Sequence, residues 1–460
     1  GCWILAQGIS RAGVIRRHAW RFFPVGLCSL LLMLTSERTA ARQGGKDAGY
    51  DNTYAYKPVA SGAQGETGAP PFYQDEPPGG GMPPPEEQPP GITRELMGYA
   101  NILCRGINLL LIFVPLGIIA GQQEWSAASR FWLNFAAIVP LAGVLGAATE
   151  SLAVHTGEMI GGLLNATFGN AVEMIVTINA IRSGLVDVVQ GSLLGSILSN
   201  LLLVLGMAFF AAGIYTKECP FNATGANANT SCLVLAAISM ALPTIFNHVP
   251  HTTQEDVLMV SRISSIVIAV IYLLFLVFQL GTHAYLFTGG EEEEEEGADL
   301  NICNSVVLLC ACTICVAVNS EILVDAIEGV TEEYGIPKAF IGVILLPIVG
   351  NAAEHTTAVT SAIKGKMDLS LGVAVGSSTQ IALFVVPFSV LIGWAYGQPM
   401  TLDFRIFDAA VLVLSVFIAS SVLSDGSSNW LEGAMLVGTY MLIAIIAWYI
   451  PDDMSGQAAE

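Results

Sequence analysis

Long apolar runs separated by short polar segments fill this chain from about Leu96 almost to its end. Many runs are close to the roughly 20 residues that cross a bilayer as an α-helix. They predict eleven spans, near residues 100–120, 130–154, 159–181, 185–214, 230–248, 258–287, 302–326, 337–363, 367–395, 405–424 and 430–450. Because an open sheet cannot satisfy its backbone hydrogen bonds in lipid, the pattern predicts an all-α polytopic membrane protein.

The segments outside the spans divide the chain further. Four arginines precede the apolar run Phe22–Leu34, which is typical of a signal peptide or a short anchor. The rest of the N-terminal extension is rich in Pro, Gly and Gln, so we expect disorder there and leave a regulatory role open. The predicted divisions are 1–94 for the extension, 95–288 for one span and a first set of five, 289–300 for an acidic linker, 301–452 for a second set of five, and 453–460 for a tail.

Composition narrows the class of protein. The chain is 53% hydrophobic and 12% charged, which no ordinary soluble domain matches. Its net charge of −20 includes an acidic run of Glu291, Glu292, Glu293, Glu294, Glu295 and Glu296, and it argues against a nucleic-acid partner. The run is either a solvated linker between the halves or a cytosolic segment that concentrates cations near the entrance. The nine cysteines have no zinc-ligand spacing, and Cys312 and Cys315 lie in an apolar run where thiols pack as small hydrophobes. We therefore expect no cofactor.

Two segments repeat at an offset of 181 residues. Gly169-Asn-Ala-Val-Glu173 aligns with Gly350-Asn-Ala-Ala-Glu354 without a gap, and the identities continue downstream. The identical pairs are Gly169/Gly350, Asn170/Asn351, Ala171/Ala352, Glu173/Glu354, Gly184/Gly365, Asp187/Asp368, Gly191/Gly372, Gly195/Gly376 and Ser196/Ser377. The copies are five spans apart, and five is odd, so the second copy is expected to face the opposite way. Inverted repeats are typical of secondary transporters, whose site lies at the repeat interface.

The repeated motif carries oxygen chemistry. A charged side chain at the centre of a membrane span costs about 2.5–3.5 kcal/mol, so Glu173 and Glu354 are functional candidates. Asn170 and Asn351 each lie three residues before the carboxylate, which places each pair on one face of a helix. Carboxylate and amide oxygens suit calcium, and two carboxylates match the charge of one divalent ion. The alternative is that each Glu is neutral and hydrogen-bonded to a neighbouring helix.

Other polar residues are weaker candidates. Ser196, Ser377 and Gln380 follow the motifs and could supply further oxygens, although helix–helix hydrogen bonding explains them as well. Asn200 carries less weight, because Ile381 stands at its register position. The glycine pairs Gly191/Gly195 and Gly372/Gly376 predict close helix approach.

Three further residues are candidates for proton coupling. Glu150 and Glu321 precede the two motifs, and an equally good interpretation places them at membrane edges. His355 directly follows Glu354 and either titrates near neutral pH or only forms a hydrogen bond.

With these motifs in hand, residues 95–452 resemble the cation/proton exchanger (CAX) family of vacuolar calcium/proton antiporters, within the calcium/cation exchanger superfamily. The likeness includes the eleven-span layout, the acidic segment after the sixth span and Asp425-Gly-Ser-Ser-Asn-Trp430 before the last. The resemblance implies calcium transport at Glu173 and Glu354, with Gly169, Gly350 and the neighbouring Asn, Ser and Gln residues lining the path. It also implies an acidic-organelle membrane such as that of the vacuole.

The predicted function is a transporter and not an enzyme. Calcium needs ionised carboxylates, and burial favours their protonated forms, so calcium and protons compete for one site. Its partners are then calcium, protons and the lipid bilayer; selectivity among divalent ions and the oligomeric state, a homo-oligomer included, stay open. The alternatives are a sodium/calcium exchanger, a cation channel and an intramembrane hydrolase. The last lacks His-Glu-x-x-His spacing. Apart from Lys364 and Lys366, most basic residues precede the first span, which predicts a cytosolic N-terminus and a cytosolic acidic linker.

Overall fold

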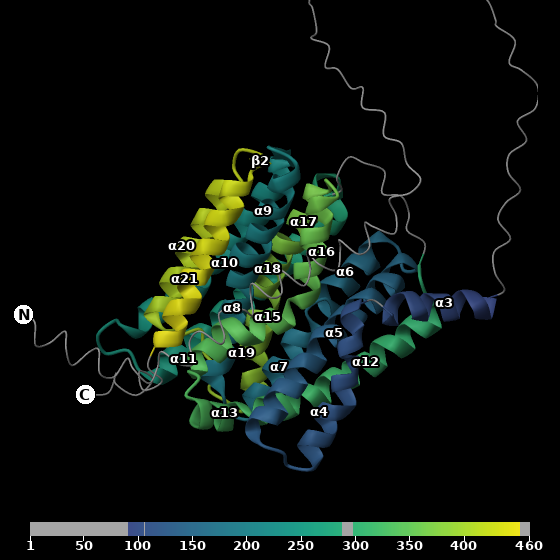
Figure 1. Cartoon of the computed structure of the whole chain (residues 1–460). Coiled ribbons are helices and arrows are strands. Elements are labelled where there is room, and N and C mark those ends of the chain that lie inside the picture. The colour runs from purple at the N-terminus through teal and green to yellow at the C-terminus, as the bar shows by residue number, and fades with distance from the viewer. Residues whose placement is uncertain (1–90, 105, 288–297, 451–460) are drawn as a thin grey trace, which may run out of the picture. The chain divides into compact units, whose positions relative to one another are not determined.

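A computed structural model of the chain describes residues 91–104, 106–287 and 298–450 (Figure 1). The predictions for the anchor-like start, the N-terminal extension up to residue 90, the acidic run Glu291–Glu296 and the C-terminal tail from residue 451 lie outside the described residues. The described chain is built almost entirely of helices, as predicted.

The first half contains the segments before the acidic linker. In chain order these are α3 (Gly91–Leu103), η1 (Gly106–Ile112), α4 (Phe113–Gln122), α5 (Ala127–Val154), α6 (Glu158–Phe168), α7 (Ala171–Arg182), α8 (Val186–Leu198), η2 (Ser199–Val204), α9 (Leu205–Tyr215), α10 (Ala223–Asn247), α11 (Gln254–Val277), η3 (Phe278–Thr282) and η4 (Ala284–Leu286). Helix α10 begins at Ala223, so the predicted start near 230 is wrong. Asn222 caps this helix by accepting from the amides of Thr224 and Gly225.

The second half follows the linker. Its helices are α12 (Ile302–Asp325), α13 (Ile327–Tyr334), α14 (Lys338–Phe340), η5 (Ile341–Leu345), α15 (Leu346–Gly350), α16 (Ala352–Ile363), α17 (Met367–Leu371), η6 (Gly372–Gly376), α18 (Ser377–Gln380), η7 (Ile381–Val385), α19 (Val386–Ala395), α20 (Ile406–Val422) and α21 (Trp430–Tyr449). The segments η2, η3, η5, η6 and η7 are turns of π-helix, whereas η1 and η4 are 3₁₀.

Span length supports a polytopic membrane protein. Within the described residues, seven helices are long and apolar enough to cross a bilayer, or up to ten if each of three bent pairs is one span. Ile406–Val422 is a shorter apolar helix beside them. The exact number of eleven and the inverted arrangement of the two halves stay predictions.

The first helices of the two copies have the same local structure at the offset of 181 residues, whereas the next segments differ, because α8 is continuous and its counterpart is divided into α17, η6 and α18. Helices α7 and α16 are both 12 residues long and begin at equivalent positions, Ala171 and Ala352. Each is followed by a glycine in the left-handed region, Gly184 at φ 75° and Gly365 at φ 82°, a conformation that favours glycine. The sequence identities therefore extend to backbone geometry.

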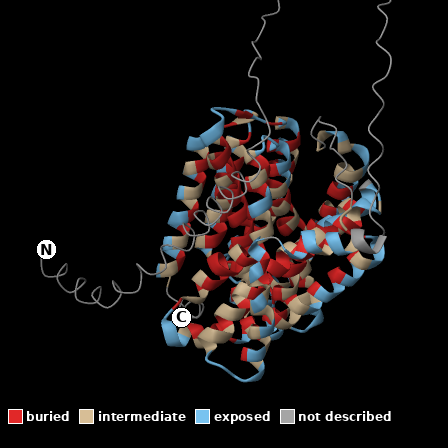
Figure 2. Ribbon diagram, turned by 45° about the vertical axis from the view of Figure 1, so that its right-hand side comes forward, coloured by how far each residue is buried: buried red, intermediate tan, exposed pale blue. Residues whose placement is uncertain are grey.

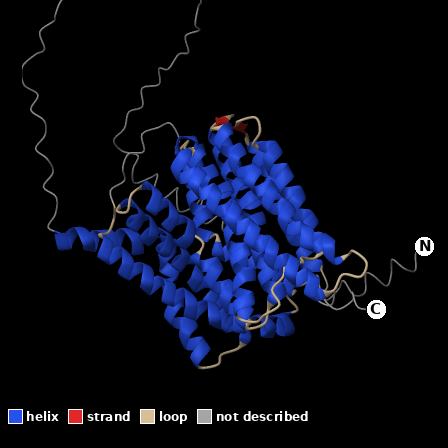
Figure 3. Ribbon diagram, turned by 180° about the vertical axis from the view of Figure 1, so that it is seen from behind, coloured by secondary structure: helices blue, strands red, loops and turns tan. Residues whose placement is uncertain are grey.

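A two-stranded antiparallel sheet was not predicted. Strand β1 (Cys219–Pro220) pairs with β2 (Ser427–Ser428), and Cys219 lies opposite Ser428 (Figure 3). The sheet joins the connection after α9 to the connection before α21. Strands of two residues give little periodic signal, so the apolar pattern could not reveal them.

Glycines allow close packing of α9 against α21, the two helices that the sheet connects. Helix α9 lies against α21, where a Cβ on Gly213 would be 2.4 Å from the main-chain nitrogen of Trp430. A Cβ on Gly433 would be 2.3 Å from that of Phe210. Buried residues run through the middle of the bundle, and exposed ones lie on its outer faces (Figure 2).

Candidate cation site

The repeated motif lies where each span is broken. Helices α6 and α7 meet at a 40° bend, and the α14–α15 segment meets α16 at 58°. Asn170 and Asn351 occupy the breaks as the N-cap residues of α7 and α16, one position before each helix begins. The prediction that each Asn shares a helix face with its Glu stays a prediction. Glu173 and Glu354 instead lie in the first turns of α7 and α16. A helix N-terminus favours negative charge, which suits a carboxylate in this position.

Glu173 reaches across to the second copy of the motif. Its carboxylate lies so close to Gly350 that a Cβ added there would be 2.7 Å from Oε1 and 3.2 Å from Cδ. The absence of a side chain at Gly350 therefore makes room for Glu173. Glu173 is 7% exposed, whereas Glu354 is half-buried.

Several oxygens at this junction are buried without a hydrogen-bond partner. They are both carboxylate oxygens of Glu173, Oε2 of Glu354, and Oδ1 of Asn351 and Asn200. Buried acceptors normally have a hydrogen-bond donor, so these oxygens need either a cation or protons as partners. In the described part of the chain, no group of three or more His, Cys, Asp or Glu side chains is placed to hold a metal ion. Amide, hydroxyl and main-chain oxygens would therefore have to complete a calcium site around two carboxylates.

Amide groups tie the two copies together around the carboxylates. Asn170 donates through Nδ2 to Oε1 of Gln380 at 2.9 Å, and Asn351 donates to the main-chain oxygen of Ser196 at 3.2 Å. Asn200 donates to Oγ of Ser377 at 2.9 Å. Each bond joins one copy of the repeat to the other, which brings the predicted residues to one place.

A cavity of about 140 Å³ lies beside this junction. It is lined by Asn165, Gly169, Asn170, Glu354, Gly372, Val373, Ser377 and Gln380. A second cavity, of about 110 Å³, shares Gly372 and Gln380 with the first. Five of the predicted site residues thus line a polar space large enough for an ion and water.

The repeated glycine pairs have different surroundings. A Cβ on Gly195 would be 2.2 Å from the main-chain oxygen of Val343, and one on Gly191 would be 3.4 Å from Cα of Gly342. The prediction of close helix approach is confirmed for this pair. It is wrong for Gly372 and Gly376, since a Cβ on either would meet nothing within 4 Å. The repeat is therefore packed tightly on one side and hollow on the other.

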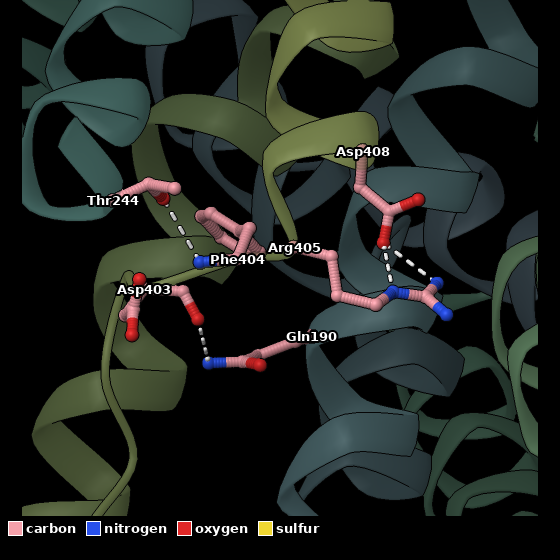
Figure 4. Close-up of polar contacts among 6 residues, drawn as sticks. All are labelled: Gln190, Thr244, Asp403, Phe404, Arg405 and Asp408. Carbon is pink, nitrogen blue, oxygen red and sulfur yellow. Dashed lines mark hydrogen bonds and ion pairs between the residues drawn. The ribbon is translucent and has the colours of Figure 1, made fainter. Parts of the chain in front are cut away.

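The connection between α19 and α20 holds the packed side in place (Figure 4). Gln190, which precedes Gly191, donates to the main-chain oxygens of Thr401 at 2.9 Å and Asp403 at 3.1 Å. Thr244 on α10 donates to the main-chain oxygen of Leu402 and accepts from the amide of Phe404. The connection is thus bound to both α8 and α10.

An ion pair and a half-buried carboxylate lie where this connection meets α20. Arg405 pairs with Asp408 at 2.6 Å in the first turn of α20 (Figure 4). Half-burial raises the pKa of Asp403, while the charge of His248 and the hydrogen bond from Asn247 act to lower it. These groups stabilise the loop, and none of them lines either cavity.

The remaining predicted residues lie apart from the cavities. Glu150 and Glu321 are exposed, and neither lines either cavity. His355 is 7% exposed and its Nε2 lies 3.2 Å from Oγ of Ser199. Ser196 is buried and contributes its main-chain oxygen, already bonded to Asn351. Their predicted roles in proton coupling or ion contact stay predictions.

Asn200, a weaker candidate in the sequence, makes contacts like those of the stronger candidates. It is fully buried in the π-helical turn η2, bonded to Ser377, and its Oδ1 lacks a partner. Ile381 stands at its register position, which counted against Asn200 in the sequence. A repeat need not place every functional residue twice, so this argument was weak. An amide in a run of leucines was the signal available.

Comparison with known proteins identifies the class. Residues 126–281 and 304–449 match the family model described as "Sodium/calcium exchanger protein", and the chain belongs to that family. It is 44% identical to the "Vacuolar calcium ion transporter" of Schizosaccharomyces pombe, over 75% of this chain and 85% of the relative. It is also 44% identical to a "Ca(2+)/H(+) antiporter" of Aphanothece halophytica, over 74% of this chain and 96% of the relative.

A solved structure agrees with this assignment. The structure of native YfkE is 37% identical in sequence, with a TM-score of 0.66, and the match covers 75% of this chain and 100% of that one. Within the superfamily, the predicted resemblance to cation/proton exchangers is confirmed by these relatives.

Proposed function

We infer that the protein is a secondary antiporter that exchanges calcium for protons at Glu173 and Glu354. The observation that carries this proposal is the buried Glu173 carboxylate, which has no hydrogen-bond partner and lies against Gly350 of the other copy. Such a group needs either a cation or a proton. The relatives named as calcium transporters and calcium/proton antiporters support calcium as the cargo.

The exchange follows from competition at one site. With both carboxylates ionised, the oxygens of Glu173, Glu354, Asn351 and Asn200 offer calcium a hard, anionic set of ligands. Protons from an acidic compartment neutralise the carboxylates and remove that attraction. Exposure of the site to each side in turn converts this competition into exchange, and no covalent step is needed. Other divalent ions such as manganese fit the same oxygen chemistry.

The first expected result concerns coupling. Purified protein in lipid vesicles should accumulate calcium when the vesicle interior is more acidic than the bath. An equal sodium gradient should drive no accumulation. The measurement is radioactive calcium uptake under each gradient, with a protonophore as the control that removes the proton gradient. Sodium-driven uptake would favour a sodium/calcium exchanger, and calcium flux without either gradient would favour a channel.

The same site chemistry suggests a location. Calcium accumulation driven by protons requires an acidic compartment, and the vacuolar relative from Schizosaccharomyces pombe supports a vacuolar or other acidic-organelle membrane. With calcium carried from the cytosol into that compartment, the N-terminus and the acidic linker face the cytosol.

Neutralising the acidic run tests its proposed role in gathering cations. The run follows Phe287 by four residues in the sequence, and Phe287 lines the second cavity. Changing Glu291–Glu296 to glutamine is expected to raise the calcium concentration for half-maximal uptake about threefold at low salt and much less near 0.15 M salt. Screening shortens the reach of exposed charges to about 8 Å there, which is the reason for the difference. An equal change at both salt concentrations would leave the run as a tether only.

A further inference from the structure

The second cavity has its own chemistry. It lies between the start of α10, the η3–η4 segment and the α17–α18 segment. Its polar lining consists of Asn222, Asn229, Gln279, Asp368 and Gln380. The volume of about 110 Å³ accommodates an ion with several waters, because one water occupies about 30 Å³ of liquid.

The lining of the second cavity is negatively charged. Among the described residues that line it, Asp368 is the one ionisable residue, and the other polar side chains are amides. Its Oδ1 accepts from the main-chain amide of Asn222 at 2.7 Å. A carboxylate offers about four acceptor positions, so this bond leaves capacity for a cation.

Asn229 supplies an independent observation. It is 6% exposed, and its Oδ1 has no hydrogen-bond partner although it is buried. Its main-chain oxygen accepts a hydrogen bond from the hydroxyl of Thr379 on α18, which holds the residue beside the cavity. A buried amide oxygen without a donor is costly. Rotation of the amide about χ2 toward a cation in the cavity would give that oxygen the partner it lacks.

We propose that the second cavity is a separate subsite for a hydrated divalent cation, held by Asp368 and the amides of Asn229 and Gln279 on the way to Glu173 and Glu354. One carboxylate with neutral amides binds such an ion weakly and through water, which suits an ion that moves on. The shared residues Gly372 and Gln380 connect the subsite to the first cavity. The proposal rests on the proposed function for the identity of its cargo.

Transport kinetics provide the first test. Asp368→Asn keeps an acceptor for the Asn222 amide but removes the charge. It should raise the calcium concentration for half-maximal uptake by three- to tenfold and leave the maximal rate within twofold. Gln279→Glu adds a carboxylate to the same cavity and should lower that concentration. The matched control is Asp187→Asn, because Asp187 is the repeat equivalent of Asp368, also exposed in the first helical turn, and lines neither cavity.

Direct binding separates this proposal from the proposed function. In a full-length Glu173→Gln/Glu354→Gln protein, Mn²⁺ binding followed by electron paramagnetic resonance should retain weak sites. Adding Asp368→Asn should remove one of them, whereas adding Asp187→Asn should remove none. Equal binding in the two triple variants, or a maximal rate that falls while the half-maximal concentration stays constant in Asp368→Asn, would overturn the subsite. Absence of proton-driven uptake in the wild type, with the Asp368-dependent binding retained, would instead overturn the antiporter alone.

Discussion

Glu173→Gln and Glu354→Gln are each expected to reduce proton-driven calcium uptake to background. Glutamine has the shape of a protonated glutamate but never ionises, so the site would stay in its neutral state. At an effective dielectric constant of about 20, two unit charges 4 Å apart attract by about 4 kcal/mol, and a divalent ion doubles this term. Even after most of that is offset by desolvation, a loss of about 3 kcal/mol would lower calcium affinity more than 100-fold.

The control for this experiment is the same chemical change elsewhere. Glu332 lies on α13, is exposed, and lines neither cavity, so Glu332→Gln should transport at the wild-type rate. Elution in detergent as a single peak would establish that the glutamine variants fold. Uptake above one tenth of wild type in either folded variant would contradict the assignment of Glu173 and Glu354 as the exchange site.

Gly350→Ala is expected to impair transport strongly through a single methyl group. The new Cβ would be 2.7 Å from Oε1 of Glu173, closer than real Cβ atoms approach an oxygen. The carboxylate is the movable end of its side chain, so we expect it to shift by about 1 Å while the helices stay in place. Ligands displaced by that distance lose much of their fit, and the calcium concentration for half-maximal uptake should rise at least tenfold.

A second helical glycine distinguishes this local effect from a general one. A Cβ on Gly438 of α21 would meet nothing within 4 Å, and Gly438→Ala should raise thermal stability slightly, because alanine favours a helix by up to about 1 kcal/mol over glycine. Its uptake should equal that of wild type. If Gly350→Ala binds calcium normally, the contact between Gly350 and Glu173 has no part in the site.

The sequence predicted the spans well because lipid imposes a simple rule on them. The expected ranges 185–214 and 367–395 agree closely with α8–α9 and α17–α19. Comparing the sequence with itself at an offset of 181 residues identified Glu173, Glu354 and their Asn neighbours. The identical residues were polar or small, and packing in an apolar span does not require such residues. These features depend on local composition and covalent order, which a single sequence contains.

Features that depend on contacts between distant segments could not be predicted. Identical glycines at Gly195 and Gly376 have opposite surroundings, because one faces η5 and the other a cavity. Asn200 gains its importance from Ser377, 177 residues away, and not from any pattern around it. The breaks at Asn170 and Asn351 also interrupt sequences that read as continuous helix.

The π-helical turns give the site a way to change. Four of them, η2, η5, η6 and η7, lie in the helices that carry or contact the repeated motifs. A π turn holds one residue more than an α turn spanning the same length. Returning it to α geometry moves that residue along the chain and rotates everything beyond it by about 100°, the angle of one residue in a helix of 3.6 per turn. Side chains such as Asn200 and Gln380 can therefore turn toward or away from the ion by a change of helical register.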